Sequence, residues 1–181
     1  MDKVKIGVIG IGNMGSSHAL YLSKGEIPNA ELKAVCDINP DRLKWAGDNL
    51  CEDVQKFDDA QALISSGAVD AVMIATPHYD HPPLAIAALK QGLHVLIEKP
   101  AGVYTKQVRE MNEVAKNTDR VFGIMYNQRT NPLYQKMRDL VQSGELGELK
   151  RTNWIITNWY RSQSYYDSGG WRATWAGEGG G

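Results

Sequence analysis

Short apolar stretches alternate with amphipathic stretches along the first two thirds of the chain. Apolar runs typical of strands covered on both faces occur at residues 4–9, 32–36, 69–75, 93–97 and 121–125. Helical spacing and helix-start signals occupy residues 13–23, 40–50, 59–65, 81–91 and 106–116. This alternation predicts a doubly wound α/β fold, a parallel sheet with helices on both faces.

Several of the predicted helices carry capping residues at their starts. Asn39 is placed to cap the helix that has Pro40 in its first turn, a position that proline favours. Asp58 and Thr105 are placed to cap two later helices. These polar residues fix where we expect the helices to begin.

The pattern changes after residue 125. A further helix is predicted over 132–143, and the stretch 150–160, KRTNWIITNWY, is rich in the β-branched and aromatic residues of strands. We therefore predict a first domain over 1–125 and the start of an α+β, mainly antiparallel domain over 126–181. The second part is small for an independent core, so we expect the sequence to be part of a longer protein.

Composition excludes several classes of function. The 181 residues carry a formal net charge of −1, so no basic field favours nucleic acid or an anionic membrane. No apolar run approaches the ~20 residues of a membrane span, and no signal peptide is recognisable at the start. The two cysteines, Cys36 and Cys51, indicate a reduced, cytoplasmic protein, and no His/Cys cluster predicts a metal site.

The sequence GIGNMG, a G-x-G-x-x-G pattern, lies between the first strand and the first helix. Gly10 permits a tight turn, Gly12 lets the backbone approach a pyrophosphate, and Gly15 lets the helix pack against the strand. The helix start at Asn13 and Met14 presents free amides to phosphates. A purely structural glycine turn is the alternative, but the strand–turn–helix context favours a dinucleotide site.

An acidic residue ends the second strand. Asp37 follows Gly15 by 22 positions, where a carboxylate accepts hydrogen bonds from the adenosine ribose hydroxyls. It also repels a 2′-phosphate, which favours NAD over NADP as the cofactor. Arg42 leaves NADP open, because a nearby arginine accommodates that phosphate. Helix capping is the structural alternative for Asp37.

Two further candidate segments follow later strands. Thr76, Pro77 and His81 come after the strand that ends at residue 75, and ligands of open parallel sheets lie beyond the carboxyl ends of the strands. These residues are therefore cofactor-side candidates. A surface or helix-start role is the alternative for His81.

The sequence VLIEKP ends an apolar strand in a carboxylate, an amine and a proline. Lys99 is placed to donate or accept a proton at a substrate hydroxyl while a hydride moves to or from a nicotinamide. Glu98 is placed to orient the chain or bind the cofactor ribose, and Pro100 restricts Lys99 to an extended backbone. An exposed ion pair at a strand end explains Glu98 and Lys99 without a function.

Five motifs together resemble the N-terminal half of the Gfo/Idh/MocA family of oxidoreductases. In chain order they are GVIGIGNMGSSH, VCDINPDR, ATPHYDH, GLHVLIEKPAG and MYNQR. The resemblance covers about the whole chain, more loosely after residue 130, and the EKP sequence is its most specific part. It implies a Rossmann fold that binds the dinucleotide, a nicotinamide ribose near Glu98 and a catalytic role for Lys99.

The resemblance also implies residues at the domain junction and a substrate class. Asn127 and Arg129 would face the nicotinamide or the substrate, and Trp171 and Arg172 fall where such proteins often place substrate-side residues. Packing and a structural ion pair are the alternative for Trp171 and Arg172. The implied reaction is NAD-dependent oxidation or reduction of a sugar, cyclitol or related polyol.

Family members usually have about twice this length, with a second domain that carries a substrate-side Asp and His and forms the dimer sheet. We therefore expect this chain to bind cofactor but to be catalytically incomplete, and the parent protein to be a homo-oligomer. A nucleotide-sensing Rossmann protein without catalysis is the leading alternative. A short-chain dehydrogenase is disfavoured because no Tyr-x-x-x-Lys pair occurs.

Overall fold

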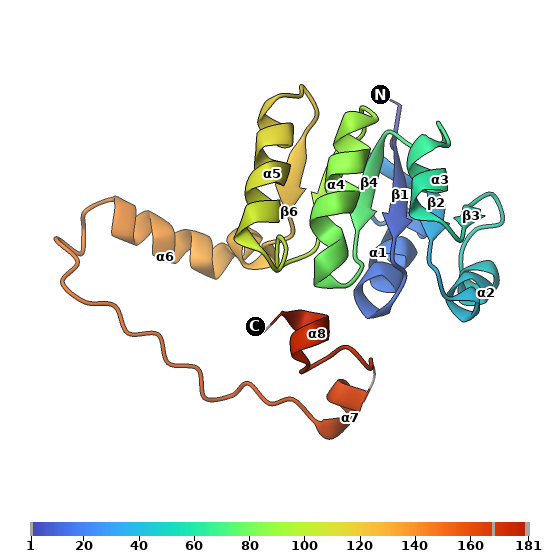
Figure 1. Cartoon of the computed structure of the whole chain (residues 1–181). Helices are drawn as coiled ribbons and strands as arrows, with labels where there is room; N and C mark the ends of the chain where they lie inside the picture. The colour runs from blue at the N-terminus through green and yellow to red at the C-terminus, as the bar shows by residue number, and fades with distance from the viewer. Residues whose placement is uncertain (1, 168, 180–181) are drawn as a thin grey trace.

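The structure is a computed structural model, and it describes residues 2–167 and 169–179. Its centre is a six-stranded parallel sheet with the strand order β3-β2-β1-β4-β5-β6 (Figure 1). The strands are β1 (Val4–Ile9), β2 (Ala30–Cys36), β3 (Gln55–Phe57), β4 (Ala71–Ile74), β5 (His94–Ile97) and β6 (Phe122–Ile124). The order reverses between β1 and β4, the point at which a Rossmann-type sheet opens its ligand crevice.

Helices cover both faces of the sheet, as predicted. One face is packed by α1 (Asn13–Ser23) and α2 (Pro40–Asn49). The other face is packed by α3 (Ala60–Ser65), α4 (His81–Lys90) and α5 (Thr105–Lys116) (Figure 1). The predicted Rossmann-type α/β fold is confirmed.

Two hydrophobic clusters, one on each face, form the core. Neighbouring residues of β1 divide between them: Val8 packs with Leu22 of α1, and Ile9 packs with Leu63 of α3 and Leu89 of α4. Because side chains alternate across a strand, β1, β2 and β4 each contribute residues to both clusters. Each such fully buried aliphatic side chain contributes ~1.5–3 kcal/mol of transfer free energy.

Of the three predicted helix caps, one is confirmed and two are wrong. The Asn39 side chain accepts a hydrogen bond from the Asp41 amide, as predicted. At α3 the capping residue is Asp59, not Asp58, and it accepts from the Ala62 amide at 2.8 Å. The predicted cap at Thr105 is wrong: Thr105 is the first residue of α5, which begins after Tyr104 without a side-chain cap.

The strand β3 was not predicted from the sequence. It has three residues, two of them exposed, and it pairs with β2 at the edge of the sheet. A strand this short shows no measurable alternation of apolar and polar residues. Only its pairing partner identifies it.

The predicted strand over 150–160 is wrong. The structure has no secondary structure there, and the side chains are exposed, with Ile155 at 82% and Trp159 at 70% of their full accessibility. β-propensity describes how well a residue fits a pleated, half-buried surface. Within 2–167 and 169–179 no strand follows β6, so this segment has no sheet to join.

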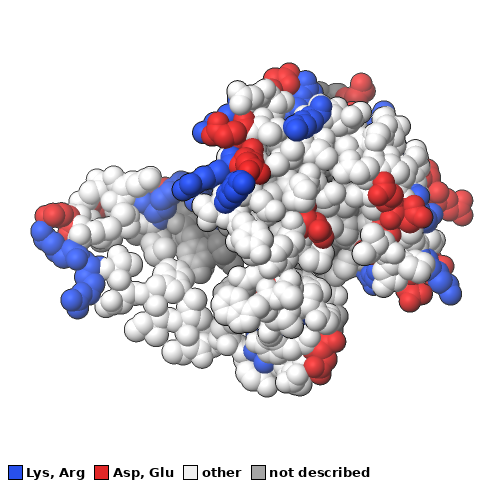
Figure 2. All heavy atoms as spheres, in the orientation of Figure 1, with Lys and Arg blue, Asp and Glu red and all other residues white. Residues whose placement is uncertain are grey.

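The chain after β6 returns to the carboxyl edge of the sheet. It runs through η2 (Asn127–Thr130) and the predicted helix α6 (Pro132–Gln142), then through an extended stretch to α7 (Gln163–Asp167) and α8 (Trp175–Glu178). In Figure 1 the red α8 lies below the start of α4. Figure 2 shows Lys, Arg, Asp and Glu side chains over the helices of the sheet and around the far end of α6, whereas the extended stretch 152–160 carries no charged residue.

None of the described helices is long and apolar enough to cross a membrane.

Candidate dinucleotide site at the carboxyl edge

The register of the sheet brings the ends of five strands into line. Ile9 of β1 pairs with Cys36 of β2 and with Ile74 of β4, and Ile97 of β5 pairs with Ile74 and with Ile124 of β6. The strands are parallel, so the residues that follow these ends share one edge. They are Gly10, Asp37, Ala75, Glu98 and Met125.

The glycine loop is closely packed on one side and open on the other. Gly10 has φ +83°, and an added Cβ there would lie 2.8 Å from the Thr76 amide nitrogen. A Cβ on Gly15 would lie 1.8 Å from the Gly10 carbonyl oxygen, so only glycine lets α1 approach β1. A Cβ on Gly12 would meet nothing within 4 Å. The loop therefore presents free space at Gly12.

Helix α1 begins at this open side without a side-chain cap. Its N-cap is Gly12, which makes no capping hydrogen bond, and the exposed Asn13 and Met14 form the first turn. The amides of a first turn have no partner within the helix and attract anions. The loop and the helix start thus form the kind of site that holds a pyrophosphate.

Asp37 and Arg42 both hold the backbone of the glycine loop. Ile11 donates its amide hydrogen to Asp37 Oδ2 at 2.9 Å, and Arg42 Nε donates to the Ile11 carbonyl oxygen at 2.7 Å. Asp37 Oδ1 accepts from the Asn39 amide. The Arg42 guanidinium also lies 4.9 Å from the centre of the Trp45 ring. The two side chains therefore shape the loop as well as facing the edge.

His81 contacts the backbone of Thr76, which lies in the loop that follows β4. The ring of His81 is fully buried, with Nε2 2.9 Å from the Thr76 carbonyl oxygen and Nδ1 2.7 Å from the Pro100 carbonyl oxygen. With both ring nitrogens occupied, His81 faces the protein interior rather than a ligand. Pro77, in contrast, is exposed at the edge.

Glu98 is a buried carboxylate with two partners. It is 7% exposed; its Oε1 lies 3.1 Å from His18 Nε2, and its Oε2 accepts from the Lys99 amide at 3.1 Å. The hydrogen bond from His18, opposed by burial and helped by the Lys99 amide, lowers the pKa of the Glu98 carboxyl group. Glu98 is therefore not the exposed half of a surface ion pair, which removes the plainer interpretation of the Glu98–Lys99 sequence.

Lys99 follows at the same edge and is exposed. The peptide bond between Lys99 and Pro100 is cis. The pKa of Glu98 is lowered mainly by the His18 hydrogen bond and that of His78 mainly by burial, and the positive charge of Lys99 adds a smaller contribution to both. Lys99 thus places a positive charge beside Glu98 and His78.

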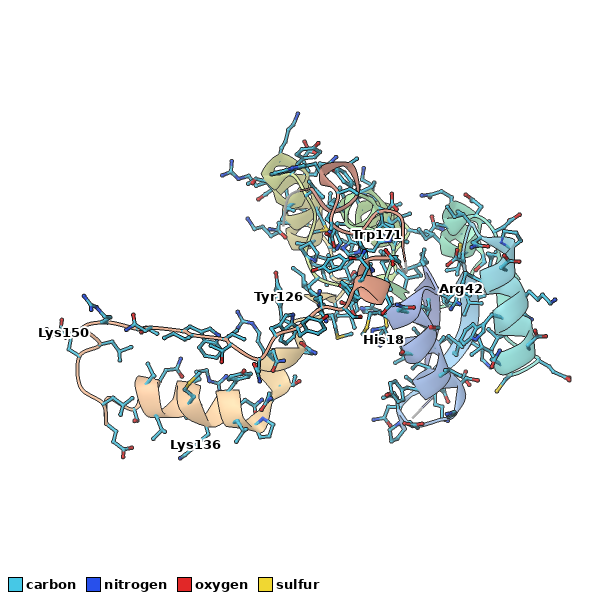
Figure 3. The ribbon with its side chains drawn as sticks, turned by 90° about the horizontal axis from the view of Figure 1, so that it is seen from below. His18, Arg42, Tyr126, Lys136, Lys150 and Trp171 are labelled. Atoms are coloured by element: carbon cyan, nitrogen blue, oxygen red, sulfur yellow. The ribbon has the colours of Figure 1, made fainter. Side chains whose placement is uncertain are left out.

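The C-terminal segment supplies aromatic side chains to the edge. The Trp171 ring packs edge-on against the His78 ring, with centroids 5.2 Å apart, and the Tyr79 hydroxyl donates to the Trp175 carbonyl oxygen. Burial is the main cause that lowers the pKa of His78. Figure 3, viewed from below, shows the chain at Trp171 near the helix that carries His18, with Lys136 and Lys150 far to one side.

The remaining predicted residues lie just beyond β6 and in the C-terminal segment. Arg172 donates to the Tyr165 hydroxyl at 2.8 Å, and its guanidinium lies over the Tyr165 and Trp171 rings. Asn127 and Arg129 lie in η2, just beyond β6, and both are exposed. The structure brings Trp171 to the edge, whereas among the described residues neither Asn127 nor Arg129 forms a hydrogen bond or ion pair with Lys99.

The residues present fit a bound dinucleotide. Open space at Gly12 and an uncapped α1 suit a pyrophosphate. Thr76 Oγ1 is buried and finds no hydrogen-bond partner among the described residues, and such a hydroxyl is costly unless a ligand or water pairs with it. These two observations support the predicted cofactor edge.

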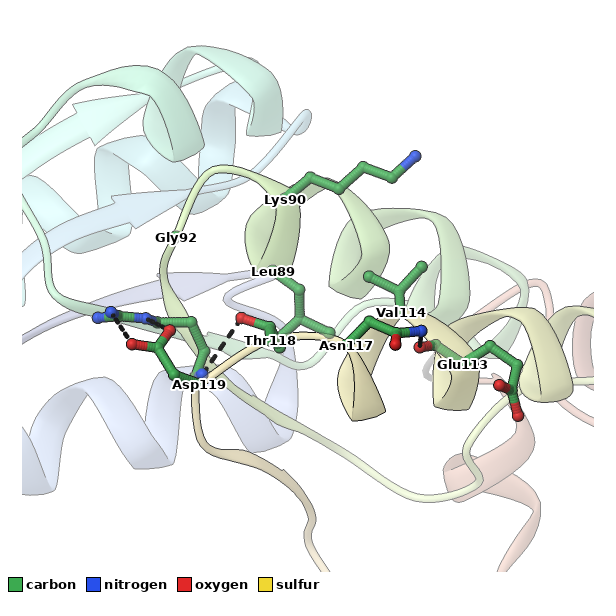
Figure 4. A pocket seen from close by; sticks show the side chains of 9 residues that line it. Leu89, Lys90, Gly92, Glu113, Val114, Asn117, Thr118 and Asp119 are labelled. Atoms are coloured by element: carbon green, nitrogen blue, oxygen red, sulfur yellow. Dashed lines mark hydrogen bonds and ion pairs between the residues drawn. The ribbon is translucent and has the colours of Figure 1, made fainter.

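A separate hollow lies at the opposite edge of the sheet. It is formed where α4 and α5 end, and its lining includes Lys90, Glu113, Asp119 and Arg120 (Figure 4). The Asp119–Arg120 pair there is 2.8 Å long. None of the predicted site residues lines this hollow.

Two residues at the carboxyl edge, His18 and His78, were not predicted from the sequence. His18 lies three positions after Gly15 on α1, so it shares the helix face that points to the sheet. That spacing could have identified it. The role of His78 depends on Trp171, more than 90 positions later in the chain, and no local pattern predicts that contact.

A glycine loop, an uncapped helix and an acidic second-strand end define a dinucleotide-binding Rossmann protein. The model of the Gfo/Idh/MocA oxidoreductase family, NAD-binding Rossmann fold, matches residues 4–126. The chain belongs to this family, and the family's cofactor, NAD, is the one predicted from the sequence.

Named relatives agree with this assignment. The chain is 34% identical over 146 residues to the myo-inositol 2-dehydrogenase of Thermotoga maritima, covering 80% of this chain and 42% of that protein. It is 32% identical over 150 residues to the rhizopine catabolism protein MocA of Rhizobium meliloti, covering 82% and 45%. The chain thus spans less than half the length of these relatives.

Among solved structures, the WlbA dehydrogenase from Bordetella pertussis in complex with NADH and UDP-GlcNAcA aligns with a TM-score of 0.83 at 26% identity. That alignment covers 97% of this chain and 53% of the other. The scyllo-inositol dehydrogenase from Lactobacillus casei with bound NAD(H) and scyllo-inositol has a TM-score of 0.75 at 30% identity, covering 81% and 43%.

Proposed function

We propose that the whole protein is an NAD-dependent oxidoreductase acting on a hydroxyl or carbonyl carbon of a sugar, cyclitol or related polyol. The observation that carries the proposal is that Lys99 follows β5 at the same sheet edge as the glycine loop of β1. Relatives named for inositols, and a solved neighbour that holds a nucleotide sugar, support ring hydroxyls as the substrate class.

The proposed role of each residue follows from its position at the carboxyl edge. Gly10, Gly12 and Gly15, with the amides of Asn13 and Met14, bind the pyrophosphate. Bound NAD supplies the nicotinamide carbon that accepts or donates the hydride.

On the nicotinamide side, Glu98 binds the ribose, and Thr76, Pro77 and Asn127 line the cofactor. Lys99 holds or moves the proton at the substrate hydroxyl. His81 belongs to this group through the backbone it contacts, since its buried ring leaves no nitrogen for the cofactor.

We further propose a preference for NAD over NADP. The Asp37 carboxylate is available to adenosine ribose hydroxyls through its remaining lone pairs. Arg42, the residue that left NADP open, directs its Nε to the Ile11 carbonyl oxygen and its plane towards Trp45. A 2′-phosphate would therefore meet the carboxylate first.

For the substrate, we propose contacts from the junction and the C-terminal segment. Trp171 offers an aromatic face beside His78, and aromatic rings suit the apolar faces of sugars. Arg172 and Arg129 offer hydrogen-bond donors to hydroxyl oxygens. Packing of Trp171 and Arg172 with Tyr165 remains the alternative for these two side chains.

The division into domains 1–125 and 126–181 stays a prediction, as do a homo-oligomer and a cytoplasmic location for the whole protein. The same holds for catalytic incompleteness of the 181-residue chain. We expect this chain to bind NADH but to show no sustained turnover, because it spans less than half the length of its named relatives and the resemblance implies a substrate-side Asp and His in the second domain. Steady turnover by the purified chain would contradict this expectation.

A second candidate is a nucleotide-sensing protein that binds NAD without catalysis. The Rossmann edge alone is compatible with it, but the exposed Lys99 beside a buried carboxylate favours an enzyme. A sensor has no need of a lysine at that position.

Replacing Lys99 separates the two candidates. The whole protein is assayed with NAD⁺ and a panel of cyclitols and sugars, as wild type and as Lys99→Met, with NADH binding measured in parallel. An enzyme loses at least ~100-fold in kcat, the usual scale of acid–base catalysis, and keeps its NADH affinity. Wild-type protein that binds NADH but oxidises no member of the panel, with an unchanged Lys99→Met variant, would support the sensor. As a matched control, Lys44→Met removes an exposed lysine of α2.

A further inference from the structure

Two histidines contact the segment Glu98–Pro100 from opposite faces of the sheet. His18 comes from α1, which packs on one face, and His81 is the first residue of α4, which packs on the other. His18 reaches the Glu98 carboxylate, and His81 reaches the Pro100 carbonyl oxygen. Lys99 is the residue between these two attachment points.

His81 also joins the segment Glu98–Pro100 to the loop that follows β4. Its second ring nitrogen lies 2.9 Å from the carbonyl oxygen of Thr76, in the loop that follows β4. A neutral ring donates to one of the two carbonyls, and a doubly protonated ring donates to both. Because His81 is 0% exposed, its ring is shielded from solvent where it meets the two carbonyl oxygens.

The ring nitrogens that contact this segment are directed at the protein rather than at a ligand. His81 has both nitrogens directed at backbone carbonyls. The Nε2 of His18 is directed at Glu98, whose other oxygen holds the Lys99 amide. The chain of contacts from His18 therefore ends on the Lys99 backbone.

We propose that His18 and His81 are positioning residues that together hold Lys99 at the cofactor edge, His18 through Glu98 and His81 through the Thr76 and Pro100 carbonyls. This inference rests on the proposed catalytic role of Lys99. The positioning itself is a property of the fold, so it is measurable in a chain that does not turn over.

The first test is amide hydrogen exchange in the 181-residue chain, followed at the Lys99 amide, with His18→Leu, His18→Gln and His81→Leu variants. We expect at least tenfold faster exchange in both leucine variants. His18→Gln keeps a donor near the position of Nε2 and restores protection. The matched control is His94→Leu, which removes a histidine that accepts from the Val121 amide at the other end of β5.

The second test separates positioning from general packing. In the whole protein, kcat falls at least tenfold in His18→Leu and His81→Leu, while the NADH dissociation constant changes less than threefold and His18→Gln recovers most of kcat. Unchanged Lys99 exchange in both leucine variants, or equal acceleration in His94→Leu, would overturn the inference. A parallel loss of NADH affinity and kcat would also overturn it, since it would mean that the whole edge is lost.

The two tests also separate this inference from the proposed function. If wild-type protein has no turnover, the proposed reaction fails, but accelerated Lys99 exchange in the leucine variants still establishes that the histidines hold the segment. If turnover is present and exchange is unchanged, the proposed reaction stands and the positioning role fails.

Discussion

The Glu98 carboxylate and the His18 imidazole, 80 positions apart in the sequence, lie 3.1 Å apart at the carboxyl edge of the sheet. This contact joins the helix that starts at the glycine loop to the strand end that carries Lys99. A single hydrogen bond therefore links the proposed cofactor-binding helix to the proposed proton-transferring residue's strand end.

The Glu98 contact predicts an acid-sensitive component of stability. The pKa of Glu98 is lowered in the folded protein, mainly by His18, so the unfolded chain binds the proton more tightly. The stabilisation is fully present above the unfolded carboxyl pKa of ~4.3 and is lost as pH falls through the lowered folded value. Urea unfolding at several pH values is expected to show a wild-type advantage over Glu98→Gln near neutral pH that shrinks under acid. Glu113→Gln, which removes an exposed pair with Lys116, is the control; an equal pH dependence there would contradict the prediction.

Alanine substitutions at two glycines of the same loop are expected to have different effects, one on stability and the other on NADH binding. Gly15→Ala places a Cβ 1.8 Å from the Gly10 carbonyl oxygen, so it destabilises by ~3 kcal/mol or more, the scale of severe overpacking. Gly12→Ala meets open space and costs ~1 kcal/mol at most as an N-cap change, but its methyl group occupies the pyrophosphate space and weakens NADH binding. Thermal unfolding and NADH titration of both variants check this.

A helix glycine outside the loop gives the control for this pair. Gly47→Ala in α2, where the nearest atom is 3.5 Å away, is expected to stabilise by ~1 kcal/mol and to leave NADH binding unchanged. A Gly12→Ala variant that binds NADH like wild type would mean that the pyrophosphate does not lie at this loop.

The cofactor preference is expected to depend on Asp37. Asp37→Ala removes the carboxylate that would accept from the adenosine ribose, so NADH affinity falls by about tenfold, the scale of ~1.4 kcal/mol, and the discrimination against NADPH is lost. Fluorescence titration with both cofactors measures the two affinities. Asp41→Ala is the matched control, an exposed acid on α2; an Asp37→Ala variant with unchanged selectivity would contradict the role of Asp37.

The two cysteines are expected to differ sharply in reactivity. Burial, helped by the charges of Asp37, Asp59 and Asp58, raises the pKa of the Cys36 thiol to about 12, and the thiolate is the reactive form. Cys51 is exposed beside Ser23, with Sγ and Oγ 3.1 Å apart. A thiol reagent at mildly alkaline pH should label Cys51 alone in the native chain and both cysteines in denaturant. Fast native labelling in a Cys51→Ser variant would show that Cys36 is accessible.

Local patterns in the sequence were sufficient for most of the sheet and for the residues that directly follow its central strands. Apolar runs identified five of the six strands, and parallel pairing then placed Gly10, Asp37 and Glu98 together. Contacts between distant segments had no such signal. The burial of His81 between two carbonyls, and the packing of Trp171 on His78, depend on tertiary geometry alone.

The error at 150–160 has the same origin. Its β-branched and aromatic residues predict a strand from composition, but a strand requires a neighbour to pair with. In the described parts of the chain, β6 is the last strand. Composition alone was therefore not enough to decide the state of this segment.

A titration of the 181-residue chain with NADH decides whether the carboxyl edge formed by Gly10–Gly15, Asp37 and Glu98 binds NAD. Trp45 lies next to Arg42 at this edge, so binding is followed by energy transfer from tryptophan to the reduced nicotinamide, with NADPH titrated in parallel. We expect saturable NADH binding that is tighter than NADPH binding and is weakened by Gly12→Ala. A folded chain that binds neither cofactor would contradict this expectation.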